Sequence, residues 1–293
     1  MVREHISGFL SDKEHEVEWF PLSTKERFIA DPFVMTDERG EKKLHVLYER
    51  YSFREKKGVI EHVSYENGFH AEPVTVLEEK THLAYPYVFM DQGKFYLVPE
   101  NSECNNISLY QSTGSPYKWK LKSILVPDFA GVDNTIIKKD GLYWLFTSNK
   151  NEGVNHNLHI FFAGTLLGRW TPHPGNPVKT DVRSSRCAGT PFIYQGEWYR
   201  PGMDYSEKIQ GRITVNRIVE LSTTEFSEVA VSQIRPVRSA FFSDKIHTLC
   251  EAGEFTLIDG CKEACILSDP IFFRYGVSML FNKINIRLTG KKP

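Results

Sequence analysis

The chain has 293 residues, of which 41% are hydrophobic and 25% charged, and 36 basic against 37 acidic side chains give a formal net charge of −1. This length and composition exclude an intrinsically disordered chain. The balanced charge argues against a nucleic-acid binder that works through net positive charge, and no run of 18 apolar residues predicts a transmembrane helix.

Residues 1–20 contain no apolar run of signal-peptide length, so we expect a cytoplasmic protein. The five cysteines are odd in number and none stands in C-x-x-C spacing, which argues against a disulfide framework and a structural zinc site. Aromatic residues reach 13%, with 20 Gly and 15 Pro. Many aromatic residues and many turn formers favour short strands over long helices.

Four short segments of the chain resemble one another at intervals of about 50 residues. They are ADPFV at 30–34, AYPYV at 84–88, VDNTI at 132–136 and GTPFI at 189–193, with a degraded fifth copy, FFSDKIHTL, at 241–249. Each precedes a polar turn and an aromatic-rich run of strand length. The spacing predicts an all-β fold, a five-bladed β-propeller of three or four antiparallel strands per blade. An all-β sandwich with accidental similarity is the alternative.

The predicted propeller covers residues 1–268, and residues 16–22 are expected to add an outer strand that closes the ring. Residues 269–293 form a short C-terminal extension in which five basic side chains alternate with apolar ones. Such a segment predicts peripheral contact with the inner, anionic face of a membrane. It fits equally a last strand or helix packed on the ring.

The first strand of each propeller blade lines the central channel, so residues at equivalent places in the repeats are expected to converge. The alignment puts Asp31, Tyr85, Asp133 and Thr190 on one ring. Glu49 and Glu100 end the second strands of the first two units, and Met203 takes the equivalent place in the fourth, with Asp204 next to it. Two carboxylates at equivalent registers indicate a site, although Asp31 also fits an Asx turn that starts a strand.

The motifs that carry a resemblance are FIADPFV, HLAYPYVF, YLVPENSE, WTPHPGNPVKTDVRSSRCAGTPF, YRPGMD and HTLCEAGEFTLIDG. With them the chain resembles the propeller domain at the N-terminus of plant glucosamine inositolphosphorylceramide transferases. It is more distantly similar to the family-43 propeller glycosidases. The resemblance spans about residues 15–262, and it implies a glycosidase-like five-bladed propeller that handles sugars.

The glycosidase resemblance implies that Asp31 is the base and that Asp133 orients it. The acid of those enzymes is a glutamate at the start of blade four, where this chain reads CAGTP at 187–191 and has no carboxylate. Glu100 is the candidate to replace it. The resemblance also places a fifth-blade histidine, here His247, near the channel axis.

Arginines stand where that acid is missing, and Arg183, Arg186 and Arg200 are predicted to hold a donor phosphate. A phosphate departs as an anion and needs no proton, so Asp31 with these arginines predicts an inverting, metal-independent glycosyltransferase. Ordinary ion pairs with Asp181 and Asp204 are the alternative for the arginines. We expect no cofactor, because the chain contains no nucleotide-binding or D-x-D motif.

Sugar binding is further expected from His82, His247, Glu49 and Tyr85, with Tyr85 stacking on a ring. The predicted partners are a phosphate-activated sugar donor and a glycan or lipid-linked acceptor in surface-glycan assembly, and no nucleic acid. Two other functions fit the same residues. One is a glycosidase or phosphorylase that uses Asp31 with Glu100 or Asp133, and the other is a glycan-binding module without catalysis.

Overall fold

A computed structural model describes residues 1–2, 5–11, 16–18, 27–35, 43–66, 69–114, 116–206, 211–236 and 245–261 of the chain. Residues 1–261 form one compact unit. The predicted extension 269–293 lies outside the described residues. Among the described residues, none belongs to a helix of the length and apolarity needed to cross a membrane.

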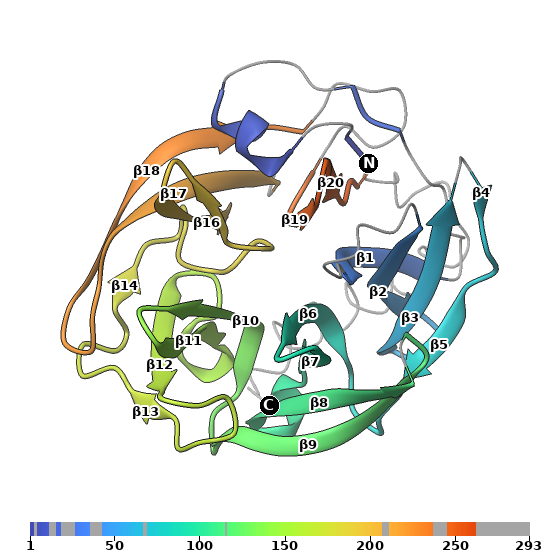
Figure 1. Ribbon diagram of the computed structural model, residues 1–293, viewed down its shortest axis with the longest axis horizontal. Coiled ribbons are helices and arrows are strands. Elements are labelled where there is room, and N and C mark those ends of the chain that lie inside the picture. The colour runs from blue at the N-terminus through green and yellow to red at the C-terminus, as the bar shows by residue number, and fades with distance from the viewer. Residues whose placement is uncertain are drawn as a thin grey trace, which may run out of the picture. The chain divides into compact units, whose positions relative to one another are not determined.

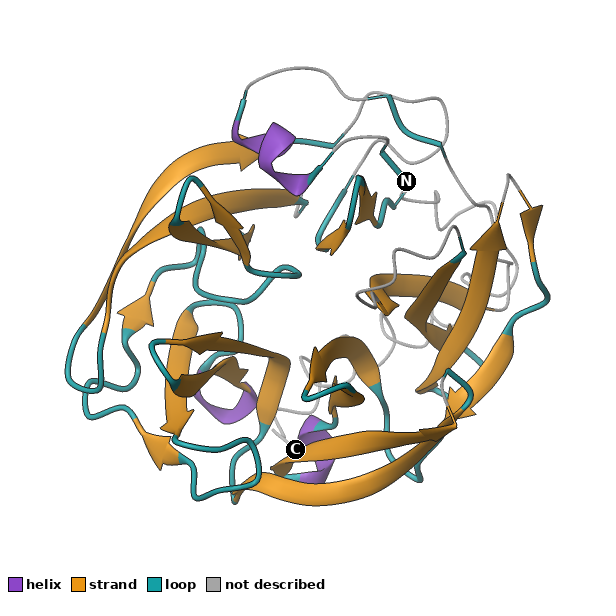
Figure 2. Cartoon of the chain, viewed as in Figure 1, coloured by secondary structure: helices purple, strands orange, loops and turns teal. Residues whose placement is uncertain are grey.

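The unit is all-β, and its sheets stand around a common centre (Figures 1 and 2). Blade one contains β1 (Arg27–Met35), β2 (Leu44–Ser52), β3 (Lys57–Glu66), β4 (Phe69–His70) and β5 (Val74–Leu77). Blade two contains β6 (Ala84–Asp91), β7 (Lys94–Glu100), β8 (Asn106–Gly114) and β9 (Lys118–Pro127). Blade three contains β10 (Gly131–Lys139), β11 (Leu142–Asn149), β12 (Asn157–Ala163), β13 (Thr171–Pro172) and β14 (Lys179–Thr180).

Blade four contains β15 (Phe192–Tyr194), β16 (Glu197–Asp204), β17 (Arg212–Leu221) and β18 (Phe226–Ile234), and a fifth sheet pairs β19 (Leu249–Ala252) with β20 (Phe255–Ile258). Three short 3₁₀ helices join them: η1 (Ile6–Leu10), η2 (Ser102–Cys104) and η3 (Lys150–Glu152). All strand pairs within the sheets are antiparallel, as predicted.

The prediction of five equal blades is wrong for the described residues, which show four blades of four or five strands and one sheet of two. The fifth repeat supplies only β19 and β20, and its further partners come from the start of the chain. Val2 bridges Thr256 of β20 on one side and Val17 on the other. The segment expected to close the ring therefore meets the last sheet through Val2, as far as its described residues reach.

The inner strands are nearly continuous apolar runs because other blades cover both of their faces. In β11, seven of the eight residues are buried, which explains why this run shows no alternation of polar and apolar side chains. One large hydrophobic cluster spans blades one to three and also includes Ile218 of blade four and Leu257 of the last sheet, and a second joins η1, blade four and the last sheet. Packing between blades, rather than within one sheet, therefore makes most of the core.

The bulges at three matching residues confirm the repeat alignment for blades one to three, whereas at the start of blade four Gly189, and not the aligned Thr190, has a positive φ. Asp31, Tyr85 and Asp133 have left-handed φ angles of 54°, 43° and 52°. In each blade the strand register shifts at this point. A bulge turns the backbone and re-aims one side chain, and such left-handed non-glycine residues gather at functional sites. The first strands of blades one, two and three thus share a bulge with a left-handed residue at the same position.

Gly189 joins blade four to the last sheet, and we expect this joint to be sensitive to substitution. Its φ is +121°, and a Cβ there would lie 1.9 Å from the carbonyl oxygen of Leu249. A Gly189→Ala variant is therefore expected to lose about 1–3 kcal/mol of unfolding free energy in urea titrations. Gly164→Ala, where a Cβ meets no atom within 4 Å, is the control and should change it by less than about 0.5 kcal/mol. Equal stability of the two variants would contradict this role.

Candidate functional site

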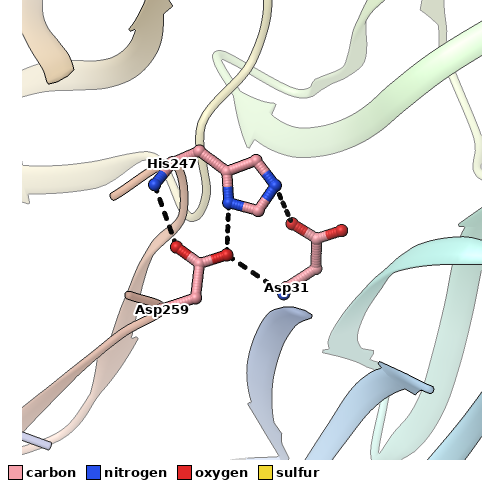
Figure 3. A group of neighbouring side chains, drawn as sticks. All are labelled: Asp31, His247 and Asp259. Carbon is pink, nitrogen blue, oxygen red and sulfur yellow. Dashed lines mark hydrogen bonds and ion pairs between the residues drawn. The ribbon is translucent and has the colours of Figure 1, made fainter. Parts of the chain in front are cut away.

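Asp31, His247 and Asp259 form a hydrogen-bonded group at the joint between blade one and the last sheet (Figure 3). Asp31 lies on the bulge of β1, His247 precedes β19 and Asp259 follows β20. The imidazole lies between the two acids, with Nδ1 on Asp259 and Nε2 at 3.4 Å from Oδ1 of Asp31. Asp259 also accepts from the backbone N–H groups of His247 at 2.9 Å and Asp31 at 3.3 Å.

The protonation of this group follows from burial and from its neighbours. Burial raises the pKa of Asp31 to about 6, although His247 and a 2.6 Å hydrogen bond from the Thr248 hydroxyl favour its charged form. Loss of water around the ring opposes charge on His247, but Asp259 and Asp31 outweigh it and raise its pKa to about 10. At neutral pH, Asp31 is therefore a carboxylate next to an imidazolium.

The same three residues offer one possible ligand atom each, all within 4.8 Å of one another. A metal requires a neutral imidazole with a free nitrogen. Here both ring nitrogens face carboxylates, and the positive charge of His247 already meets Asp31 and Asp259. The arrangement fits a proton-holding group better than a metal centre.

A second charged pair comes from blades three and four. The Arg186 guanidinium donates through Nε to Asp133 at 2.5 Å and through Nη1 to Asn155 at 3.0 Å. Its remaining nitrogen, Nη2, takes part in neither bond, and the guanidinium lies 5.7 Å from the ring centre of Tyr205. The Arg186 side chain is 20% exposed. Arg186 directly precedes residues 187–191, the stretch in which the sequence resemblance implies an acid and the chain has no carboxylate.

Two further carboxyl groups share this environment. Burial, followed by the charge of Asp133, raises the pKa of Glu100 to about 8, although Arg186 and a hydrogen bond from Ser102 act against it. Burial, followed by the charges of Asp31 and Glu100, raises the pKa of Glu49 well above its usual range. Glu100 is therefore protonated at neutral pH, whereas Asp31 is not, and Glu49 is shifted in the same direction as Glu100. Carboxyl groups of different pKa in one site are the usual basis of acid–base chemistry.

The structure separates the three predicted arginines. Arg200 is 1% exposed, and its guanidinium pairs with Glu228 and with the backbone carbonyls of Ser184 and Ser185. It is committed to the interior of blade four, so its predicted role on a donor phosphate is wrong. Arg183 is exposed and pairs with Asp181, the ion pair weighed above as the alternative. Only Arg186 of the three reaches Asp133.

Tyr85 and Asp204 also lie elsewhere than predicted. Tyr85 is fully buried, packs edge-on against Phe33 at 4.8 Å, and its hydroxyl accepts from the backbone N–H of Gly189 at 2.6 Å. It supports the core at the centre of the ring and offers no face to a sugar. Asp204 is buried and accepts from Gln233 and Ser206 within blade four.

His82 lies beside Glu49, and Asp31, Asp133, Glu100 and His247 interact electrostatically with one another. The predicted sugar contact of His82 stays a prediction. The sequence reasoning missed Asp259, Thr248 and Asn155. A signal for Asp259 was present, because this carboxylate directly follows the second strand of its repeat, β20. Asn155 gave none, since it lies in a turn between β11 and β12.

Comparison with known proteins supports the predicted resemblance. The model of the family described as glucosamine inositolphosphorylceramide transferase 1, N-terminal, matches residues 20–240. The curated transferase 1 of this name from Arabidopsis thaliana is 35% identical over 211 residues, covering 70% of this chain and 27% of that protein. Its counterpart from Oryza sativa subsp. japonica is 31% identical over 198 residues, covering 63% and 26%. The chain thus spans about a quarter of the length of these relatives.

Solved structures that resemble this one include propeller glycoside hydrolases. The catalytic domain of the GH62 α-L-arabinofuranosidase of Coprinopsis cinerea superposes with a TM-score of 0.61 at 16% identity, covering 81% of this chain and 86% of that one. A GH43 protein of Bacillus licheniformis gives 0.53 at 15% identity, covering 71% and 45%. At such identities the likeness establishes the propeller fold alone.

Proposed function

Because the chain belongs to the family described as glucosamine inositolphosphorylceramide transferase 1, N-terminal, we propose that it takes part in transferring a sugar from a phosphate-activated donor to a lipid-linked acceptor. The observation that supports this most is a buried carboxylate, Asp31, that interacts electrostatically with Asp133, which in turn pairs with the guanidinium of Arg186. The relatives' name suggests glucosamine as the sugar and inositolphosphorylceramide as the acceptor.

In the proposed step, Asp31 accepts the proton of the acceptor hydroxyl while that oxygen forms a bond to the anomeric carbon. The bond from the anomeric carbon to the donor phosphate breaks, and its electron pair leaves on the phosphate oxygen. Nη2 of Arg186 donates to that oxygen as negative charge develops. Attack and departure on opposite faces of the sugar invert the anomeric centre. The positive charge comes from the protein, so the proposal includes no metal.

A glycoside hydrolase is the second candidate, and one observation favours it. Glu100 has a pKa of about 8 and Asp31 one of about 6, so at neutral pH the first can give a proton and the second can accept one. In that case Glu100 protonates the leaving oxygen and Asp31 activates a water. The two functions differ in whether Glu100 is needed.

A donor screen with a Glu100→Gln variant separates the candidates. The chain is incubated with nucleotide- and lipid-phosphate-activated sugars, glucosamine donors first, and with inositolphosphorylceramide as acceptor, and the mass of the acceptor is followed. Aryl glycosides test for hydrolysis. We expect transfer that Glu100→Gln retains to within about an order of magnitude, because a phosphate leaves without a proton.

Other outcomes of the screen contradict the proposed transfer. Hydrolysis of aryl glycosides that Glu100→Gln abolishes identifies a hydrolase. Sugar binding without turnover on any donor identifies a glycan-binding module. Asp181→Asn, which removes an acid in the loop after β14, is the matched control and is expected to leave every rate unchanged.

A further inference from the structure

Three aromatic rings form an exposed cluster at the end of blade one, which we call the aromatic shelf: Phe28, Tyr51 and Phe53. Phe28 of β1 and Tyr51 of β2 are cross-strand partners, and their rings stack at 5.0 Å with an interplanar angle of 16°. Phe53 meets both rings edge-on, at 5.7 and 5.6 Å. Phe28 is 37% exposed, and the other two are half-buried. Unlike Tyr85, these rings present surface to solvent.

The shelf is continuous with the carboxyl group of Glu49. The Tyr51 ring contacts the His82 ring edge-on at 5.7 Å, and Nε2 of His82 lies 3.8 Å from Oε1 of Glu49. Glu49 in turn pairs across the strands with Ala30, the neighbour of Asp31. Phe28 stands three residues before Asp31, about 10 Å along the strand. A ligand on the shelf therefore lies next to the proposed base.

Glu49 carries a buried oxygen without a hydrogen-bond partner. Its side chain is 6% exposed, and Oε1 has no partner in the part of the chain that the structure describes. Such an atom is unfavourable unless something else bonds to it. The 3.8 Å to His82 is too long for a direct hydrogen bond, so both groups are available to an oxygen placed beside them.

His82 and Glu49 present a hydrogen-bond donor and a carboxyl group to the same gap. Nδ1 of His82 accepts from the backbone N–H of Gly58 at 2.8 Å, so the proton of the neutral ring is on Nε2, facing Glu49. Burial lowers the pKa of His82 and raises the pKa of Glu49, which shifts both groups toward their uncharged forms. Such partners favour a hydroxyl group over an ion.

The space at Glu49 depends on a glycine. A Cβ at Gly58 would lie 2.8 Å from Oε1 of Glu49, 2.8 Å from Cε1 of His82 and 2.3 Å from the carbonyl oxygen of Leu83. Only a residue without a side chain lets β3 approach this closely. The sequence thus keeps both polar groups in place around one gap.

We propose that the aromatic shelf, with Glu49 and His82 at its inner end, is a subsite for the ring of a neutral sugar or cyclitol. A sugar ring has an apolar C–H face, which fits the aromatic rings, and a hydroxyl edge, which fits the imidazole and the carboxyl group. An alkyl chain would leave Oε1 of Glu49 without a partner, and a phosphate would face the charge of Asp31. The assignment rests on the proposed function only in taking a sugar as the substrate.

Titration of the whole chain with a panel of methyl pyranosides, methyl furanosides and myo-inositol, followed by saturation-transfer NMR, tests the subsite. We expect Tyr51→Ala and Glu49→Leu to weaken the best probe about tenfold, and Tyr51→Phe, which keeps the ring, to bind as the wild type does. Tyr194→Ala removes a tyrosine ring that is 37% exposed from blade four and should change nothing. Thermal melting of each variant checks its fold.

The subsite is overturned if Tyr51→Ala binds like the wild type, if Tyr194→Ala weakens binding equally, or if the wild type binds none of the panel. These results are separate from those that decide the proposed function. Asp31→Asn is expected to stop turnover and to leave binding of the probe within about twofold. Turnover that is independent of Asp31, with binding still dependent on Tyr51, would reject the transfer mechanism and retain the subsite.

Discussion

An Asp31→Asn variant is expected to lose about 10²- to 10⁴-fold in transfer rate while keeping its fold, because it removes the proposed proton acceptor. The substitution is conservative in every other respect. Asparagine adopts the left-handed conformation that φ of 54° requires. Its side-chain oxygen still accepts from Thr248 and faces His247. The loss therefore measures basicity and not geometry.

The test is to measure the steady-state transfer rate and the urea unfolding curve of the wild type and of Asp31→Asn. Asp181→Asn, in an exposed ion pair with Arg183, is the matched acid-to-amide control and should retain the wild-type rate. A rate for Asp31→Asn within about threefold of the wild type would remove Asp31 from the chemistry. A rate loss that accompanies an equal loss of folded protein would assign it to structure instead.

The second large effect is expected in the pH dependence of kcat/KM. Protonation of Asp31 determines how kcat/KM falls at low pH. The base works only when it is deprotonated, and burial sets its pKa at about 6. Activity is therefore expected to fall about tenfold for each pH unit below 6 and to be constant above it. His247, with a pKa of about 10, stays protonated across this range and keeps Asp31 oriented.

The alkaline side distinguishes the two candidate reactions. If Glu100 must donate a proton, kcat/KM falls as the pH rises through about 8, because the Glu100 carboxyl group is deprotonated above its pKa of about 8. Transfer from a phosphate donor needs no such acid, so its rate should stay level through pH 8. A profile from pH 4.5 to 9.5, repeated with Glu100→Gln, decides this. A descending limb near pH 8 that the variant lacks would contradict the transfer mechanism.

The repeat predicted more of the fold than of the site. Spacing of about 50 residues was enough to predict blades and to align Asp31, Tyr85 and Asp133, because a shared bulge leaves a shared sequence pattern. It did not predict that the fifth repeat supplies two strands in the described residues. That outcome depends on pairing between Val2 and Thr256, which are 254 residues apart and leave no local pattern.

Side-chain direction was the part that the sequence did not determine. Tyr85 occupies the same register as Asp31, yet its ring packs into the core because an aromatic side chain gains more from burial than from facing water. Arg186 and Arg200 are equivalent candidates in the sequence. Only tertiary packing shows that Arg186 pairs with Asp133 and Arg200 with Glu228. The shelf was missed because Phe28 and Tyr51 read as ordinary strand residues.

The hydrogen bonds of Asp31 with Thr248 and Asp259 join positions 217 and 228 residues apart, where the first blade meets the last sheet. A chain that has completed only four blades lacks the residues that hold Asp31 in place. In the proposed mechanism, such a partly made molecule would have no oriented base. The contacts that close the ring are thus also the contacts that orient Asp31.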